Sequence, residues 1–345
     1  MESSQSEADA RSPKLTGSWE RAGRSPAAAA VFGLLGIGML YMHAQSLLVV
    51  GATLVTGGIQ RSGDFFADLA AASRLLRLPV QLSLVLSQVF FMLVPVSLLV
   101  RRWHTSEVRH YLRLRRVPSA EIVLAVLATL LFLPASAWTS EQFVRWVGIP
   151  RKLIAIEEHL FSAGTIPEYL WLVLVVAITP AVCEEILFRG YAQRTLERRI
   201  GWKAIPVIGV FFGLYHMQPL GLLQLSALGF LFGFLFYRSR SLLPAMAAHF
   251  TNNVVLVTLL YLTSNGFPAN AGGWMDADVA IAGLLILFPV LVAYDRLARY
   301  RHLRAVAGSG RAFVTGESTD WVGPPETPSA PPGGRHDASA GGEEN

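Results

Sequence analysis

The sequence contains few charged residues, which make up only 15% of its 345 positions. A soluble domain usually carries about 25% charge. Apolar residues reach 52%, and they occur in blocks of roughly 20, the length that a helix needs to cross about 30 Å of hydrocarbon. The low charge therefore excludes an ordinary soluble domain and indicates a protein embedded in a lipid bilayer.

The sequence also has only one cysteine and lacks the common catalytic motifs. Cys183 is the only cysteine, so no internal disulfide can form, and no neighbouring residue supports it as a nucleophile. The sequence lacks a Gly-x-Ser-x-Gly elbow, a His-Glu-x-x-His zinc helix and a P-loop. No basic patch with interleaved aromatic residues occurs, so the net charge of +5 predicts no nucleic-acid partner and instead concerns membrane topology and anionic lipid.

Eight apolar segments predict an all-α integral membrane protein with about eight transmembrane helices. The predicted spans are residues 27–55, 78–100, 120–138, 168–188, 204–218, 220–237, 242–263 and 278–295. The fifth span is short, and the sequence Gln218-Pro219-Leu220-Gly221 predicts a tight hairpin between the fifth and sixth spans.

Polar segments flank this membrane domain, which is predicted to cover residues 27–300. Residues 1–26 are predicted to form a disordered cytoplasmic arm, because the apolar stretch after Pro26 is too long for a secretory signal. Residues 305–345 are rich in proline and glycine. They cannot bury enough apolar surface to offset the entropy cost of ordering and are predicted to be a disordered tail.

The distribution of positive charge predicts the topology. With eight spans, both termini lie on one side, and the segments on that side carry 23 of the 29 Lys and Arg residues. Positive residues favour the cytoplasmic side. We therefore expect a multi-pass protein of the cell membrane with both termini in the cytoplasm.

Two adjacent acids end the fourth predicted span. An ionisable group in mid-bilayer costs about 2.5–3.5 kcal/mol on insertion scales and usually marks a functional site. Glu185 and Arg189 are four residues apart, so they share a helix face and can neutralise each other. Glu184 points about 100° away. The alternative is that the helix simply becomes polar where it reaches the membrane surface.

The fifth and seventh spans each carry a histidine. His216 follows Phe212 by one turn, and His249 and Asn253 are four apart, so that they face the same way. Taken singly, these residues are also typical of interhelical hydrogen bonds and close packing. Four further polar residues in the spans are isolated and are interpreted as packing or interfacial residues: His43, Gln45, Gln88 and Gln224.

Together, the three clusters favour hydrolysis. A carboxylate can act as general base on water, and imidazole and amide groups can donate hydrogen bonds to a developing oxyanion. Buried Glu and His residues also suit a transporter with a proton relay, but the sequence shows no inverted repeat and no matched broken helices.

The motifs resemble those of the CAAX-processing and bacteriocin-processing (CPBP, or Abi) family of intramembrane endopeptidases, including CAAX prenyl protease type 2. The family pattern is Glu-Glu-x-x-x-Arg, Phe-x-x-x-His and His-x-x-x-Asn or Asp on successive membrane helices. The corresponding residues here are Glu184 to Arg189, Phe212 to His216 and His249 to Asn253. The resemblance covers about residues 168–260.

The resemblance implies an eight-helix fold and a glutamate-activated water as the nucleophile. Glu184 would then be the base, with His216 assisting at the water. His249 and Asn253 would form the oxyanion hole, while Glu185 and Arg189 would orient the site.

The resemblance leaves the cofactor and the activity open. Family members have also been called metalloproteases, and two histidines and a glutamate are possible zinc ligands, but we expect no cofactor. The expected partner is a membrane-associated protein or peptide substrate within the bilayer, and the sequence sets no oligomeric state. The alternative function is a non-catalytic immunity or partner-binding protein on the same fold, since some family members are linked to bacteriocin immunity.

Overall fold

The computed structural model describes residues 13–55, 64–148, 160–218, 221–268 and 270–308. Within these ranges the chain forms helices and connecting turns and contains no strand. The prediction of an all-α membrane protein is confirmed, because seven helical stretches of the described chain are long and apolar enough to cross a membrane.

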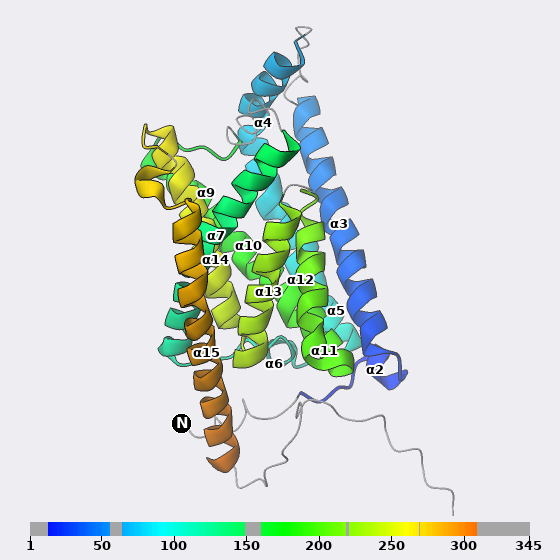
Figure 1. Ribbon diagram of the computed structural model, residues 1–345. Helices are drawn as coiled ribbons and strands as arrows, with labels where there is room; N and C mark the ends of the chain where they lie inside the picture. The colour runs from blue at the N-terminus through cyan, green and yellow to red at the C-terminus, as the bar shows by residue number, and fades with distance from the viewer. Residues whose placement is uncertain (1–12, 56–63, 149–159, 219–220, 269, 309–345) are drawn as a thin grey trace, which may run out of the picture.

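The first three predicted spans each lie within a long helical stretch, and the chain runs up, down and up through them (Figure 1). The second stretch consists of two α-helices joined by a π-helical segment. A short helix at the lower end then leads to the third stretch. The elements are α3 (Pro26–Val55), α4 (Phe65–Gln88), η1 (Val89–Leu93), α5 (Val94–Trp103), α6 (Val108–Tyr111) and α7 (Ser119–Val147).

The fourth span is longer than predicted. The prediction ended it at residue 188, but the helical stretch continues to Ile200 and contains two further π-helical segments. Its elements are α9 (Ile166–Leu172), η2 (Val173–Ile178), α10 (Thr179–Glu185), η3 (Ile186–Gln193) and α11 (Arg194–Ile200). Arg189 is therefore buried inside this stretch and does not belong to a cytoplasmic loop.

The fifth predicted span forms a short helix. Gly201, with φ 56° and ψ −137°, redirects the chain into η4 (Gly201–Lys203) and α12 (Ala204–Tyr215). The 12 residues of α12 extend only about 18 Å at 1.5 Å per residue, less than the hydrocarbon thickness. The continuous helical stretch Ile166–Tyr215 thus contains the fourth predicted span and the helix of the fifth. The structure therefore has seven long apolar stretches where the sequence predicted eight spans.

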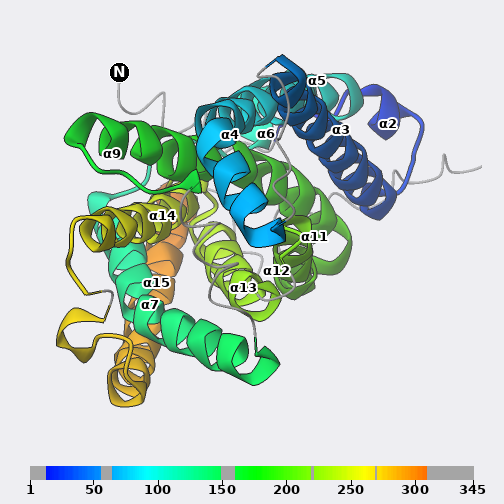
Figure 2. The ribbon, with the colours of Figure 1, turned by 90° about the horizontal axis from the view of Figure 1, so that it is seen from above.

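The remaining helices complete the bundle. They are α13 (Leu222–Ser239), α14 (Leu242–Ser264), η5 (Ala271–Gly273) and α15 (Ala277–Gly308). Seen from above, α7, α14 and α15 form one side and α3, α4 and α5 the other, with α10, α12 and α13 between them (Figure 2). Glu184 and Glu185 lie on α10 and His216 follows α12, while His249 and Asn253 lie on α14, which packs against α10.

The segment before α3 is ordered where we predicted a disordered arm. Residues 1–12 lie outside the described chain, but α2 (Ser18–Arg21) packs against the lower end of α5. The backbone N–H of Gly17 donates to the carbonyl of His104 at 2.7 Å, and the rings of Trp19 and Trp103 stack with centroids 4.7 Å apart. We call residues 13–25 the N-terminal strap.

The last helix extends beyond the predicted start of the tail. We placed its start at residue 305, whereas α15 continues to Gly308. Residues 309–345 lie outside the described chain.

Candidate functional site

The predicted site residues lie on three elements in the middle of the bundle. Glu184 and Glu185 end α10, His216 caps the C-terminus of α12, and His249 and Asn253 lie on α14. A π-helical segment begins directly after Glu185, and two others flank this region in α4–α5 and α9–α10. Such segments are frequent at functional sites because they change the angular direction of the side chains.

Glu184 is almost buried, with 8% of its surface exposed, and each of its carboxylate oxygens faces a different helix. The amide Nε2 of Gln88, the last residue of α4, donates to Oε1 at 3.2 Å. Oε2 lies 3.8 Å from Nε2 of His216. The sequence interpretation of Gln88 as an isolated packing residue is therefore wrong.

One ring nitrogen of His216 forms a hydrogen bond to the backbone of its own helix. Its Nδ1 lies 2.7 Å from the carbonyl oxygen of Phe212, and because a carbonyl only accepts, Nδ1 carries the hydrogen. In the neutral ring Nε2 is then an acceptor that faces Glu184 Oε2. Two acceptors at 3.8 Å are close enough for one water molecule to contact both.

Glu185 forms a separate, fully buried ion pair. Nη1 of Arg189 donates to Oε1 of Glu185 at 2.8 Å, as the spacing of four residues predicted, and neither side chain is exposed. His249 Nδ1 lies 2.9 Å from the same oxygen. The second guanidinium nitrogen of Arg189 donates to the carbonyl of Gly229 on α13 at 3.1 Å. These contacts tie α10, α13 and α14 together.

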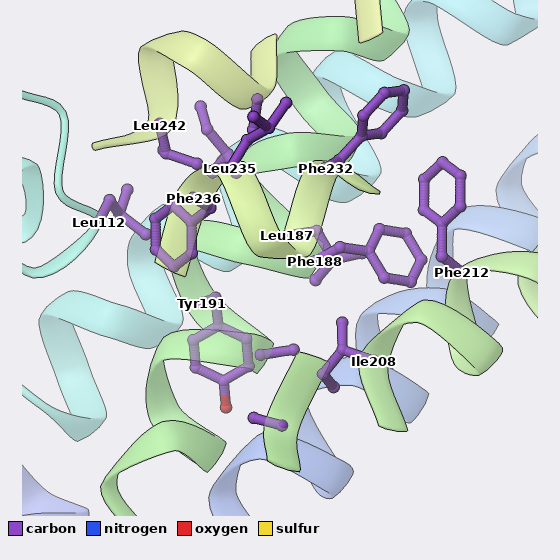
Figure 3. Packing of buried hydrophobic residues seen from close by; sticks show 14 of the residues in the cluster. Leu112, Leu187, Phe188, Tyr191, Ile208, Phe212, Phe232, Leu235, Phe236 and Leu242 are labelled. Carbon is purple, nitrogen blue, oxygen red and sulfur yellow. The ribbon is translucent and has the colours of Figure 1, made fainter. Parts of the chain in front are cut away.

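Aromatic rings enclose both histidines. Phe212 meets the ring of His216 edge to face at 4.8 Å and that of His249 at 5.8 Å. Phe232 stacks on His249 at 5.2 Å. In Figure 3 the rings of Phe188, Phe212 and Phe232 lie close together, and the guanidinium carbon of Arg189 is 4.4 Å from the centre of Phe212. Phe212 thus joins the Glu184–His216 pair to the Glu185–His249 pair in one cluster.

Asn253 has a different set of partners from the one we expected. Its amide nitrogen donates to the carbonyl of Val176 at 2.8 Å, and its oxygen accepts from Asn252 at 2.8 Å. Val176 lies in η2, so Asn253 bonds a carbonyl of a π-helical segment. Its amide nitrogen keeps one further hydrogen to donate.

The long fourth span also brings Glu184 and His216 to a similar depth. Glu184 lies 16 residues before the end of α11 and His216 lies 12 residues after the start of α12. At 1.5 Å per residue these positions are about 24 Å and 18 Å from the turn at Gly201. Placing Arg189 at the membrane surface would have separated the two residues.

The donor set does not fit a metal ion. The two histidines contact different glutamates, and no group of three His, Cys, Asp or Glu side chains in the described chain is arranged to hold a metal. A tetrahedral zinc site needs three or four such ligands around one point, and we therefore assign no step to a metal.

These observations define a helical membrane protein with a charged, aromatic-lined centre built by four helical stretches. The family model described as type II CAAX prenyl endopeptidase Rce1-like matches residues 166–255, from the start of α9 into α14. All three motifs lie within the matched residues, and the predicted resemblance to CAAX-processing membrane proteases is confirmed. The match supports a CAAX-type intramembrane protease in general. No curated protein and no solved structure matches the chain.

Proposed function

We propose that the protein is an intramembrane endopeptidase that hydrolyses a peptide bond with a water molecule activated by Glu184. The observation that carries this proposal is the 3.8 Å separation of Glu184 Oε2 and His216 Nε2, whose side chains are 10% and 26% exposed. The family match supports the reaction class. The substrate is a membrane-associated protein or peptide, and a prenylated CAAX sequence is the chemistry to test first.

The proposed reaction begins with a water molecule that donates its hydrogens to Glu184 Oε2 and His216 Nε2. Glu184 takes one proton while the water oxygen bonds to the carbonyl carbon of the scissile peptide. The C–N bond then breaks, and the carboxylic acid of Glu184 returns the proton to the leaving nitrogen. Glu184 thus ends the cycle as a carboxylate.

His249 is suited to the oxyanion. Its Nδ1 lies 2.9 Å from Oε1 of Glu185, and this contact fixes the direction of the ring, much as a buried carboxylate does in a Ser-His-Asp triad. A proton on Nε2 can then be donated to the negative oxygen. The remaining amide hydrogen of Asn253 can add a second donor.

The test compares wild-type protein with Glu184→Gln, which keeps the shape and removes the base. The purified proteins in lipid nanodiscs are assayed with an internally quenched farnesylated peptide that ends in a CAAX sequence. The matched control is Glu141→Gln, because Glu141 is a partly exposed acid that pairs with Arg145 on its own helix. We expect Glu184→Gln to abolish cleavage and Glu141→Gln to retain it.

A second readout covers substrates other than this peptide. The membrane and secreted peptidomes of cells that express wild-type protein or Glu184→Gln should differ in cleaved fragments. If both variants give the same peptidome and the same peptide cleavage, the endopeptidase proposal is wrong and the non-catalytic immunity or binding function takes its place. If a chelator abolishes cleavage and zinc restores it, the water-activating role passes from Glu184 alone to a metal.

A further inference from the structure

Among the residues that the structure describes, Gln88 is the one outside the matched family segment whose side chain donates to a site carboxylate. It lies 96 positions before Glu184 in the sequence, and the contact between them is buried. Gln88 itself is 3% exposed. A hydrogen bond from an amide to a carboxyl oxygen is directional, and it is electrostatically stronger in a low-dielectric interior than in water.

The geometry divides the two oxygens of Glu184 between different partners. Gln88 fixes Oε1, and this leaves Oε2 towards His216. Rotation of the carboxylate would exchange the two oxygens, so a donor on Oε1 limits the orientations in which Oε2 faces the imidazole. A general base must be within hydrogen-bond reach of the proton it takes.

The backbone holds Gln88 firmly in this position. Gln88 is the last residue of α4, and the π-helical segment η1 starts at the next residue. One turn earlier in the helix, Leu84 accepts a hydrogen bond from Ser87. Tyr41 on α3 also contacts the Gln88 side chain. Gln88 thus extends from the end of α4, next to Tyr41 of α3, towards Glu184 of α10.

We propose that Gln88 is a positioning residue for the general base: it orients the Glu184 carboxylate so that Oε2 faces His216 and the attacking water. The kinetic part of this inference rests on the proposed endopeptidase function. The structural part, a coupling between Gln88 and Glu184, does not.

The kinetic test uses Gln88→Met, which keeps the length of the side chain and removes its N–H donor. We expect kcat on the farnesylated CAAX peptide to fall roughly 10–100-fold, the scale of one hydrogen bond to a charged group, with KM within about twofold of wild type. The matched control is Gln81→Met. Gln81 is a buried glutamine on the same helix that binds Leu160 and Trp171 and makes no contact with Glu184.

Two kinetic outcomes overturn the proposal. One is an unchanged kcat in Gln88→Met. The other is a loss of kcat that Gln81→Met reproduces with the same KM, because this pattern would indicate a general effect of disturbing α4.

A double-mutant cycle tests the contact without using activity. The melting temperature is measured for Gln88→Met in the wild-type background and in the Glu184→Leu background, which has no carboxylate to orient. We expect the loss in Tm to be smaller in the Glu184→Leu background by at least about 2 °C. Equal losses in the two backgrounds overturn the proposal. Gln88→Leu replaces Gln88→Met in both arms if the first variant does not fold.

The two experiments separate the possible failures. If wild type and Glu184→Gln cleave alike, the endopeptidase function fails, and the cycle alone then decides whether Gln88 orients Glu184. If wild type is active and Glu184→Gln is not, a normal kcat in Gln88→Met rejects the positioning role while the endopeptidase function stands.

Discussion

Arg189 is the most demanding residue of the site, because its guanidinium is fully buried in the bundle. It is held by the carboxylate of Glu185, the carbonyl of Gly229 and the faces of three phenylalanines. A buried charge is tolerated only when it is paired and hydrogen-bonded. The ion pair with Glu185 therefore mainly stabilises the folded protein, and in addition it helps to orient His249.

We predict that Arg189→Met greatly lowers the amount of folded protein. The change leaves Glu185 buried without its counter-ion, a loss of about 3–5 kcal/mol for a broken buried pair. The measurement is the yield of monodisperse protein by size-exclusion chromatography, together with its Tm. Arg199→Met is the matched control, since Arg199 is exposed on α11. A normal yield for Arg189→Met would contradict the prediction, whereas Glu185→Gln should partly restore the yield of Arg189→Met.

At this scale the sequence predicted the residues but only some of their partners. The helical angle of 100° separated Glu184 from Glu185, and the structure shows them facing different helices. The spacing of four predicted the pair of Glu185 with Arg189. The contacts of Gln88 with Glu184 and of His249 with Glu185 join distant helices, and a single sequence contains no local pattern that reveals them.

At the scale of secondary-structure elements, the close packing of α12 on α13 positions His216. Helices α12 and α13 meet at glycines: a Cβ on Gly229 would lie 2.7 Å from the carbonyl oxygen of Gly209. Contacts this close between backbones require small residues, as in other membrane helix pairs. The packing of α12 on α13 thereby limits the position of α12, and so of His216, relative to α10.

We predict that Gly229→Ala forces α12 and α13 apart, lowers Tm and reduces peptide cleavage at least about tenfold, since small displacements of catalytic groups are costly. Gly36→Ala is the matched control, because its Cβ would meet nothing within 4 Å. That change should be neutral or stabilising by up to about 1 kcal/mol. Equal effects of the two substitutions on Tm and cleavage would contradict the role assigned to the glycine contact.

The N-terminal strap is held by one ionic cluster at the lower end of the bundle. Arg198 donates to both carboxylate oxygens of Glu20, at 2.5 and 2.8 Å, and Nδ1 of His104 lies 2.5 Å from the first oxygen. Burial acts to raise the pKa of Glu20, but the hydrogen bonds and charges of Arg198 and His104 outweigh it and bring the pKa to about 2. Burial lowers the pKa of His104, so a neutral ring donates its Nδ1–H.

We predict that acid loosens this strap. The pKa of Glu20 falls from 4.5 to about 2 on folding, so its contribution is complete above pH 4.5 and is lost as the pH falls towards 2. His104 acts in the same direction below its ordinary pKa of 6.5, because its ring binds a proton more readily once the strap is released and the ring is exposed. The protection factor of the Gly17 amide, which is its intrinsic hydrogen-exchange rate divided by the observed rate at the same pH, should fall on acidification.

Glu20→Gln should remove the part of this pH dependence that lies below about pH 4.5. The variant should also exchange faster at neutral pH, because an uncharged amide binds Arg198 less strongly. Glu107→Gln, an exposed acid, should behave as wild type. A Gly17 protection factor that does not vary between pH 7 and pH 3 would contradict the prediction.

The helices were predicted well where the length of an apolar run determines them. They were predicted poorly where the helix changes from α to π geometry. The apolar runs predicted a helix in each of the eight segments. The polar stretch after residue 188 predicted a loop, because Arg189 and Arg194 are charged; both are buried in the continuing helix. The π-helical segments depend on packing between helices, so their positions could not be predicted from composition.

For the whole molecule we predict that both termini lie in the cytoplasm. Figure 1 places α2, α6, α11 and the last turns of α15 at the same end. Removing the buried Arg189 and Arg194 from the count still leaves 21 of the remaining 27 Lys and Arg residues on the predicted cytoplasmic side. Reporter fusions at residue 110 and after residue 300 should both report the cytoplasm, and an external signal from either one would reject this topology.

The order of synthesis determines when each acid of the site meets its partner. Gln88 is made 96 residues before Glu184, and Arg189 follows Glu185 by four residues on the same helix. His249 comes 64 residues after Glu185, a delay of roughly 3–13 s at 5–20 residues per second. Both carboxylates can therefore enter the membrane with a partner already made, and the histidines reach them later. The chain can thus insert its acids first and assemble its reactive centre only when α14, the seventh predicted span, has been synthesised.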